Sequence, residues 1–226
     1  MYYNDVMQRK IKLSEGEYYH IYNRGVEKRE VFTDLQDYER FFRLLYLSNG
    51  DKAYTYRLVQ GVPLNKIDRG NHLTAIGAYV LMPNHFHLLL KETSEGGISK
   101  FMEKLTTGYS MYFNKKNDRV GPLFQGSFKA QHVDRDEYLK YLFAYIHLNP
   151  VKLIDPEWKE NGIQDRKRAK EYLAGYRYSS YPDYLGKERE EVAILDRKEF
   201  PEYFSGSGAR DFEEFVDDWL EFGKEK

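Results

Sequence analysis

The sequence predicts an α+β fold, in which helices pack on one face of an antiparallel sheet and a helical extension follows at the C-terminus. The chain has 226 residues, which suits one domain with an appendage. β-Prone runs and runs with helical spacing follow one another in the order β-α-β-β-α-β-α. No apolar run approaches the roughly 18 residues of a membrane-spanning helix, so no membrane partner is expected.

Four segments form the first half of this fold. Residues 18–25 (YYHIYNRG) are β-prone and stop at a glycine, which predicts a strand. Residues 34–49 begin with an aspartate that can cap a helix and repeat apolar residues at helical spacing. Residues 50–72 are polar with scattered Gly and Pro, and predict a loop. Residues 74–91 are two β-rich runs broken by Pro83-Asn84, which predicts a strand pair with a tight turn.

The second half contains a helix, a strand and a helix. Residues 98–117 have apolar positions at helical spacing, and residues 115–133 turn at a Gly-Pro pair and return as a β-prone segment. Asp134 and Glu137 predict a capping box for the next helix, which Pro150 stops.

The chain divides near residue 153. We expect one domain in residues 1–153 and an extension in residues 154–226, with a Lys- and Arg-rich helix at 157–175. The chain ends in DFEEFVDDWLEFG, which predicts an acidic amphipathic helix whose apolar side packs on the body or on a partner.

Charge is distributed unevenly along the chain. The 35 Lys and Arg and 36 Asp and Glu give a net charge of −1, which alone disfavours nucleic-acid binding. Residues 186–226 hold 7 basic and 13 acidic side chains, whereas residues 1–185 hold 28 basic and 23 acidic ones. A mildly basic body with an acidic tail restores nucleic acid as a candidate partner. The 21 tyrosines are compatible with base stacking, and equally with a tyrosine-built core.

The chain has no cysteine, which excludes a disulfide scaffold, a thiolate zinc site and a cysteine nucleophile. Its first residues contain no apolar stretch typical of a secretory signal, so we expect a cytoplasmic protein.

His85-Phe86-His87 is the sharpest local motif. On a strand, residues two apart point to the same face, so the two imidazoles can close on one divalent ion. The alternative is a pair of hydrogen-bonded histidines beside a turn. Without cysteine, a third ligand would be an oxygen ligand or another histidine, and a site with open positions suits Mg²⁺ or Mn²⁺ with a substrate phosphate.

The helix before Pro150 offers a second group. Tyr138, Leu142, Tyr145 and Asn149 share one face, and the last two lie one turn apart. They can supply a nucleophile and a metal ligand, or they can simply be core residues followed by a cap.

Several motifs in order resemble one family: YHIYNRG, YVLMPNHFHLLL, LTTGYSMYFNKKN, GPLFQGSFKAQHV and YLKYLFAYIHLNPVK. Together they resemble the single-tyrosine HUH transposases of the insertion-sequence 200/605 group, most closely the REP-associated tyrosine transposase branch. The resemblance runs from about Tyr18 to Lys152. It implies an HUH fold with a ferredoxin-like, RRM-like sheet.

The resemblance also implies roles for individual residues. His85 and His87 correspond to the two histidines of the HUH motif, Tyr145 to the nucleophilic tyrosine, and Asn149 to the polar residue that completes the metal site. The implied enzyme is a metal-dependent DNA-nicking and joining transposase. It forms a 5′-phosphotyrosine intermediate and leaves a free 3′-hydroxyl.

The implied partner is single-stranded DNA with a hairpin. The family includes homodimers, whereas the REP-associated branch can act as a monomer. Five basic residues on or beside the metal-bearing elements are candidates for contacting the DNA backbone; they are Arg24, Lys115, Lys116, Arg119 and Lys129.

Two other hypotheses remain open. The chain can be a domesticated transposase-derived module that binds nucleic acid without cutting it. It can also be a metal phosphodiesterase that uses the H-x-H motif and water, with Tyr145 in a structural role.

Overall fold

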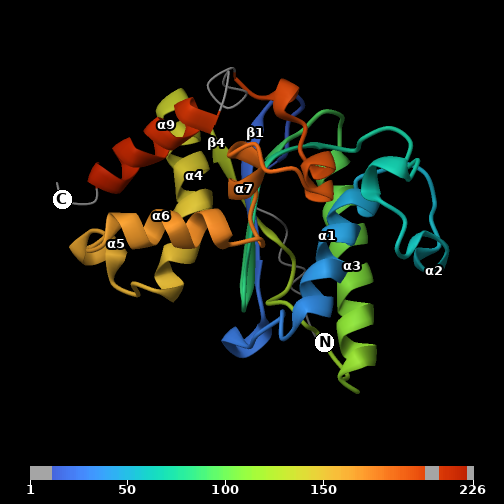
Figure 1. Ribbon diagram of the computed structural model, residues 1–226. Helices are drawn as coiled ribbons and strands as arrows, with labels where there is room; N and C mark the ends of the chain where they lie inside the picture. Colours follow the sequence, from blue (N-terminus) through green and yellow to red (C-terminus); the bar gives the residue numbers. More distant parts are fainter. Residues whose placement is uncertain (1–11, 202–208, 223–226) are drawn as a thin grey trace, which may run out of the picture.

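A four-stranded antiparallel sheet lies at the centre of the computed structural model, which describes residues 12–201 and 209–222 (Figure 1). The strands are β1 (Tyr18–Arg24), β2 (Ala75–Met82), β3 (His85–Lys91) and β4 (Lys129–Val133), in the spatial order β2-β3-β1-β4. β3 pairs antiparallel with both β1 and β2, so β1 and β2 run in the same direction on either side of it. This arrangement is the split β-α-β unit of ferredoxin-like folds. The predicted α+β class and antiparallel sheet are confirmed.

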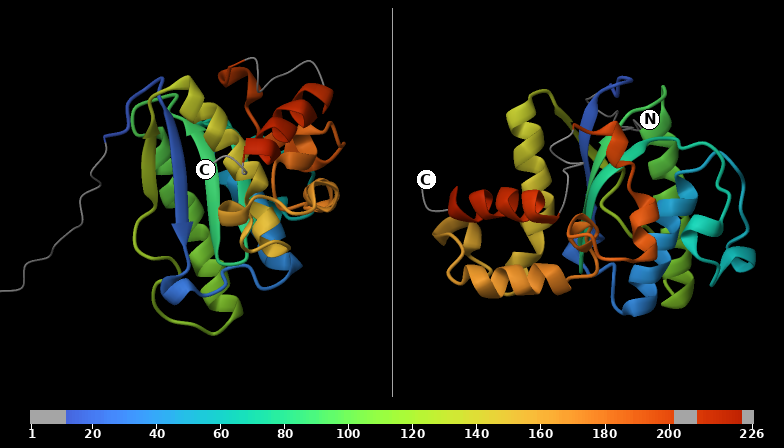
Figure 2. Two further views of the ribbon diagram at one scale, coloured as in Figure 1. Left: turned by 90° about the vertical axis from the view of Figure 1, so that its left-hand side faces the viewer. Right: turned by 45° about the horizontal axis from the view of Figure 1, so that its top comes forward.

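Helices cover both faces of the sheet. α1 (Leu35–Ser48) and α3 (Gly97–Lys116) lie on one face, and α4 (Asp136–Leu148) lies on the other, as both views in Figure 2 show. The expectation that helices cover a single face was wrong. β2 is buried at all of its positions, and a strand that is apolar on both sides needs cover on both faces.

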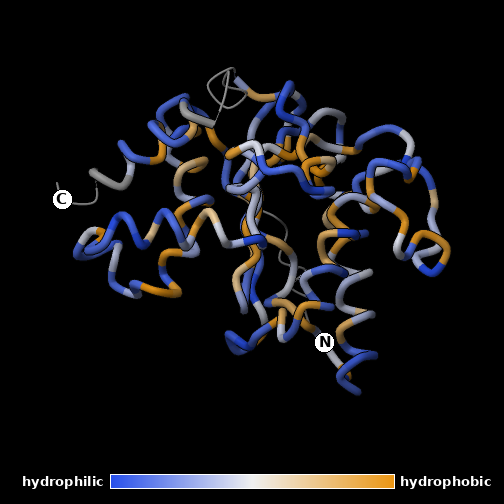
Figure 3. Tube along the Cα trace, in the orientation of Figure 1, coloured by the Kyte–Doolittle hydropathy of each residue, from blue (hydrophilic) through white to orange (hydrophobic). Residues whose placement is uncertain are grey.

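Two apolar cores follow from this layering. The first fills the space between the sheet and the helix pair α1 and α3, and includes Phe41, Phe86 and Tyr109. The second lies between the sheet and α4, and includes Leu89 and Phe143. Alternating side chains of β3 supply both cores, because successive residues of a strand point to opposite faces. Figure 3 shows hydrophobic residues gathered along the strands, whereas α6 (Arg166–Gly175) is largely hydrophilic.

The C-terminal extension is helical, as predicted, and covers the free edge of β2. The backbone N–H of Leu81 donates to the carbonyl of Tyr178, and the N–H of Ser180 donates to that of Tyr79. α7 (Tyr181–Tyr184) follows directly. An unpaired strand edge is a template for association with other chains, so this cover protects the sheet.

α9 (Ala209–Phe222) is the predicted acidic helix, and its apolar side packs back on the body. Phe212 and Val216 are buried in the second core, and Phe212 contacts Phe143 of α4. The side chain of Phe222 lies outside the described residues.

Most predicted boundaries are confirmed, and three local expectations, besides the one about the faces of the sheet, were wrong. Asp34 caps α1 as expected, its side chain accepting from the N–H of Asp37. The capping box at Asp134 is not formed, because that carboxylate pairs with Arg135 and α4 begins two residues later. The helix expected at 157–175 is two helices, α5 (Trp158–Asn161) and α6.

The third difference is in the loop at 50–72, which contains the one-turn helix α2 (Tyr56–Val59). Short 3₁₀ segments complete the secondary structure; they are η1 (Val26–Lys28), η2 (Leu64–Lys66), η3 (Asn149–Leu153), η4 (Glu190–Ile194) and η5 (Arg197–Glu199). Among the described helices, none has the length and apolar character needed to cross a bilayer.

Candidate active site

The centre of the site is built by the two middle strands. β1 and β3 pair so that Tyr22 lies opposite His87 and Arg24 lies opposite His85. Because side chains alternate along a strand, all four point to one face of the sheet. Phe86, between the two histidines, points to the other face and is fully buried in the first core. The predicted placement of both imidazoles on one face is confirmed.

α4 crosses this face and contributes the tyrosine. The rings of Tyr145 and His87 meet edge to face, with their centroids 5.5 Å apart. Asn149 begins η3 directly after α4, one turn beyond Tyr145, and is 3% exposed. Its side-chain Nδ2 is buried and has no hydrogen-bond partner among the described residues. The structure therefore brings His85, His87, Tyr145 and Asn149 together.

These residues line a cavity of about 350 Å³. Its lining consists of Tyr22, Asn23, Arg24, His85, His87, Gln125, Lys129, Tyr145, Asn149, Lys152 and Lys159. Four of these side chains are cationic, and none of these described lining residues carries a carboxylate. A cavity with this charge pattern attracts an anionic ligand.

Two of the five predicted DNA-contacting residues, Arg24 and Lys129, line the cavity. The other three lie at or just beyond the C-terminal end of α3, which packs on the opposite face of the sheet from α4. There Lys116 pairs with Asp34, and Arg119 donates to Asn114. Lys115 is exposed at the same end. The structure does not bring Lys115, Lys116 and Arg119 to the site.

Each histidine of the motif has its Nδ1 atom engaged by a neighbouring side chain. His85 donates from Nδ1 to Asn84 Oδ1 over 2.6 Å. The Nδ1 atom of His87 lies 2.8 Å from Nε2 of His20, and the two rings stack. Metal-binding histidines usually have their second nitrogen held in this way, which leaves the Nε2 lone pair for the metal. These two imidazoles and the Asn149 carboxamide thus fit a divalent cation.

The surroundings keep these imidazoles neutral. Burial, followed by the charges of Arg24 and Lys152, lowers the pKa of His85 to about 4. Burial also lowers the pKa of His87 well below its usual value, and it lowers the pKa of His20 to about 4. A neutral imidazole can bind a metal, whereas a protonated one cannot.

In the described part of the chain, no group of three His, Asp or Glu side chains is arranged to hold a metal. His20 is the third histidine nearby, but its ring bonds to His87 rather than converging with the Nε2 atoms of the motif. A third protein ligand at this place therefore has to be a residue of another type; the side chain of Asn149 lines the cavity and interacts with His85.

Sequence reasoning missed four residues that complete the site: His20, Tyr22, Lys152 and Lys159. The strand YHIYNR contains a signal for the first two, because His20, Tyr22 and Arg24 alternate on one face. Lys152 follows Asn149 by three residues in the motif YIHLNPVK. No local sequence pattern predicts Lys159 as a site residue, since it lies in the extension and is brought to the cavity only by the fold of the chain.

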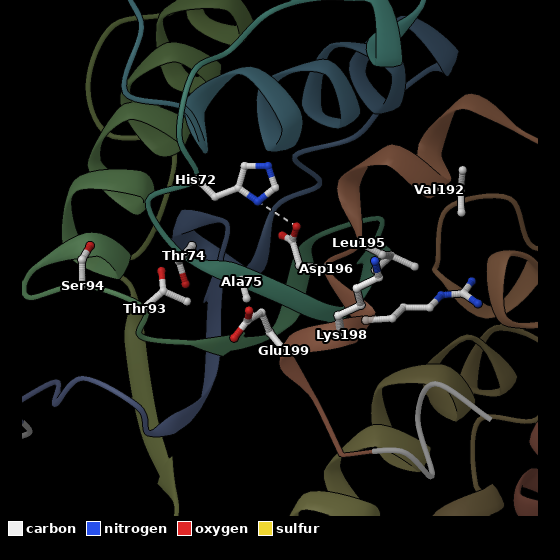
Figure 4. A pocket seen from close by; sticks show the side chains of 11 residues that line it. His72, Thr74, Ala75, Thr93, Ser94, Val192, Leu195, Asp196, Lys198 and Glu199 are labelled. Atoms are coloured by element: carbon white, nitrogen blue, oxygen red, sulfur yellow. Dashed lines mark ion pairs between the residues drawn. The ribbon is translucent and has the colours of Figure 1, made fainter.

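A second cavity, of about 680 Å³, lies by the edge strand β2 beneath residues 192–199 (Figure 4). His72 and Asp196 point toward each other across it, with Nδ1 and Oδ1 2.7 Å apart. Asp196 also accepts from the N–H of Ile76, and Thr74 donates to the carbonyl of Lys91. The contacts of Asp196 attach the extension to the sheet and to the preceding loop, and that of Thr74 joins the start of β2 to β3, so the polar groups serve the fold.

Comparisons with known proteins are consistent with this geometry. Residues 65–149 match the family model described as "Transposase IS200 like". The matched segment contains both histidines of the motif, Tyr145 and Asn149, and the resemblance predicted from the sequence is confirmed there. Among curated proteins, none is significantly similar to this chain.

Two of the solved structures that are similar to the chain share little sequence identity with it. One is a REP-associated tyrosine transposase bound to a REP hairpin, with 13% identity, 81% of this chain and 89% of that chain covered, and a TM-score of 0.49. The other is the tRNA(His) guanylyltransferase of Saccharomyces cerevisiae, with 11% identity, 90% of each chain covered and a TM-score of 0.34.

Proposed function

We propose, from the match of residues 65–149 to the IS200-like transposase family model, that this protein cuts and rejoins single-stranded DNA. Tyr145 is the nucleophile in this proposal. His85, His87 and Asn149 hold a divalent cation, Mg²⁺ or Mn²⁺. The DNA carries a hairpin near the cleavage site, as the sequence resemblance implies.

The charge of the cavity is the observation that carries this proposal. Arg24, Lys129, Lys152 and Lys159 surround the histidines and Tyr145, without a carboxylate among the described lining residues. A phosphodiester backbone is the polyanion that such a cavity suits. A tyrosine and two neutral imidazoles in the same cavity add a nucleophile and metal ligands.

A single strand fits the cavity better than a duplex. The ammonium of Lys129 lies 6.0 Å from the ring centroid of Tyr22, so an aromatic face and a cation are side by side. Proteins that bind single strands combine cations along the backbone with aromatic rings that stack on bases. Tyr22 is the stacking residue we propose.

The reaction starts with attack of Tyr145 Oη on the phosphorus atom of a phosphodiester. The Oη–P bond forms, the P–O3′ bond breaks, and the phenolic proton ends on the departing oxygen. The products are a 5′-phosphotyrosine and a free 3′-hydroxyl. The aryl ester retains the energy of the phosphodiester, so a 3′-hydroxyl can later attack it and rejoin the DNA without ATP.

The cation would be held by Nε2 of His85, Nε2 of His87 and the carboxamide of Asn149. When bound, it supplies polarisation of the scissile phosphate and offsets charge in the transition state. The chain's own residues orient these ligands: Asn84 holds His85, and His20 holds His87.

The test is formation of a covalent adduct. Protein is mixed with labelled single-stranded hairpin DNA and Mn²⁺, and the products are separated under denaturing conditions. We expect an adduct from the wild type and none from Tyr145→Phe or His85→Ala. Tyr141→Phe is the matched control, because Tyr141 stacks on Tyr145 from the preceding turn of α4 and does not line the cavity.

The other hypotheses give different results in this assay. An adduct with Tyr145→Phe means that the nucleophile is another residue. Cleavage without an adduct supports a metal phosphodiesterase that uses water. Binding without cleavage supports a domesticated transposase-derived DNA-binding protein.

The cellular location, the oligomeric state and the domain boundaries of the enzyme are part of the same proposal. We propose that it acts in the cytoplasm, as a monomer or a homodimer, with residues 1–153 as the nuclease domain and residues 154–226 as an extension. Light scattering of the purified protein, with and without DNA, distinguishes the two oligomeric states.

A further inference from the structure

Lys159 of α5 contacts the atom that we propose as the nucleophile. Its ammonium nitrogen lies 3.3 Å from Tyr145 Oη, to which it donates a hydrogen bond. The same nitrogen lies 4.3 Å from the centroid of the Tyr145 ring and 5.7 Å from that of Trp158. A cation over an aromatic ring face is attracted by the ring quadrupole, so three contacts hold this ammonium in place.

The segment around Lys159 is built to hold it there. The side chain of Trp158 packs against the second core. Asn161 donates from its side chain to Glu157, and the N–H of Gln164 donates to Asp155. The turn that carries Lys159 is therefore attached on both sides, although it lies outside the segment that matches the transposase family.

The charge of Lys159 is available for a ligand. Among the described carboxylates, none lies within ion-pair distance of its ammonium. Lys152 lines the same cavity and is exposed. An ammonium without a carboxylate beside it can compensate the charge of a reacting group, because no fixed anion already neutralises it.

We propose that Lys159 is a catalytic residue that orients Tyr145 Oη and stabilises the negative charge on this oxygen as it attacks. The inference rests on the proposed function. In the step, the Oη–P bond forms, the P–O3′ bond breaks and the phenolic proton ends on the 3′-oxygen. Lys159 keeps its own protons and acts as a charged hydrogen-bond donor to Oη throughout.

The test compares rates of adduct formation at saturating DNA and Mn²⁺. We expect Lys159→Ala to lower the rate by about 10²-fold, as loss of one charged donor at a reacting oxygen does. Lys159→Arg should restore part of the loss, and added methylammonium should partly rescue Lys159→Ala. Lys167→Ala is the control, since Lys167 is an exposed lysine of the neighbouring helix α6 and does not line the cavity.

The outcomes separate this inference from the proposed function. Absence of an adduct with the wild type contradicts the proposed function itself. An adduct that forms equally fast with the wild type and with Lys159→Ala overturns the role of Lys159 alone. A loss that neither Arg nor methylammonium restores, together with weaker DNA binding, overturns it as well. Rescue by the free amine supports it, since a purely structural defect is not repaired by methylammonium.

Discussion

At the scale of single residues, the site depends on side chains whose hydrogen bonds orient the proposed metal ligands. His87 can present Nε2 to a cation because its Nδ1 is engaged by His20 at 2.8 Å. His20 is 7% exposed, and burial keeps its ring neutral, so it can accept that hydrogen bond. A buried imidazole pair of this kind fixes the tautomer and the direction of the ligand.

His20→Gln should therefore weaken Mn²⁺ binding by about 10- to 100-fold, the usual cost of losing a partner that orients a metal ligand. The measurement is calorimetric titration of Mn²⁺ into protein with bound single-stranded DNA, in a Tyr145→Phe background that prevents cleavage. His132→Gln is the control, because His132 pairs with Glu17 at an exposed position. Equal Mn²⁺ affinity of the His20→Gln and control proteins would contradict this role.

His147 makes the stability of the fold depend on pH. It is fully buried, with Nδ1 2.9 Å from the carbonyl of Phe143 and Nε2 2.7 Å from Ser180 Oγ. Burial lowers its pKa from 6.5 to about 3. Below pH 6.5 the unfolded chain binds a proton that the folded chain does not, so stability falls as the pH drops from 6.5 toward 3.

His147 contributes about 1.4 kcal/mol per pH unit to the slope of the free energy of unfolding against pH. Urea unfolding of the wild type and of His147→Gln between pH 4.5 and 6 measures it. We expect the variant to be less stable at neutral pH and to have the smaller slope. Identical slopes would show that His147 is not the source of this dependence.

At the scale of elements, hydrophobic periodicity predicted much and missed what depends on distant contacts. The helices at 34–49 and 98–117 are present, since each carries a clear period of 3.6, and the strands at 18–25 and 74–91 are present as β-prone runs bounded by turn residues. The run AIGAYVLM is apolar throughout, which already indicates cover on both faces of the sheet, although the prediction placed the helices on one face.

The cover of β2 by the extension left no local signal in the sequence. Arg189 is the link: it pairs with the buried carboxylate of Asp183 at 2.6 Å and donates to the hydroxyl of Tyr79 at 2.8 Å. Tyr79 in turn donates to Asp183 over 3.0 Å. This network joins the extension to the edge strand from inside the molecule.

Arg189→Met should lower the free energy of unfolding by about 3 kcal/mol, because it leaves the Asp183 carboxylate buried without its partner. Urea denaturation at neutral pH is the measurement. Lys198→Met, an exposed cation on the same extension, is the control and should change stability little. Equal stability of the two variants would contradict a structural role for the Arg189 network.

At the scale of the whole molecule, the net charge of −1 conceals how charge is arranged. The cations of the cavity lie beside Tyr145 of α4, whereas the acidic helix α9 packs on α4 through Phe212 and Val216. The N–H of Asp196 donates to the carbonyl of Ile76 in β2, so the acidic tail of residues 186–226 is attached to the sheet edge as well as to α4.

The salt dependence of DNA binding tests which cations contact the backbone. Each contact with a single strand contributes about −0.7 to the slope of log K against log salt concentration. Lys129→Ala should weaken binding and make the slope shallower by about this amount. Lys115→Ala should change neither, since Lys115 lies at the end of α3, away from the cavity. The opposite result would restore the DNA contact predicted for Lys115 from the sequence.

How much of the site could be predicted also depends on scale. His85, His87, Tyr145 and Asn149 were predictable, because strand alternation, helical spacing and a family pattern each act over a few residues. Predicting His20 as a site residue requires knowing which strands pair. Predicting Lys159 requires knowing the path of the chain after Pro150. Lys115 and Lys116 were placed at the DNA by proximity in sequence, whereas the sheet separates α3 from α4.

The most direct test of the central claim is to locate the covalent bond. Wild-type protein is reacted with single-stranded hairpin DNA and Mn²⁺, the adduct is treated with nuclease and trypsin, and the peptides are fragmented by mass spectrometry. We predict a nucleotide attached to the peptide of residues 141–152, with fragments that place it on Tyr145 and leave Tyr141 unmodified. A nucleotide on any other residue, or DNA cleavage with no modified peptide, would contradict the account.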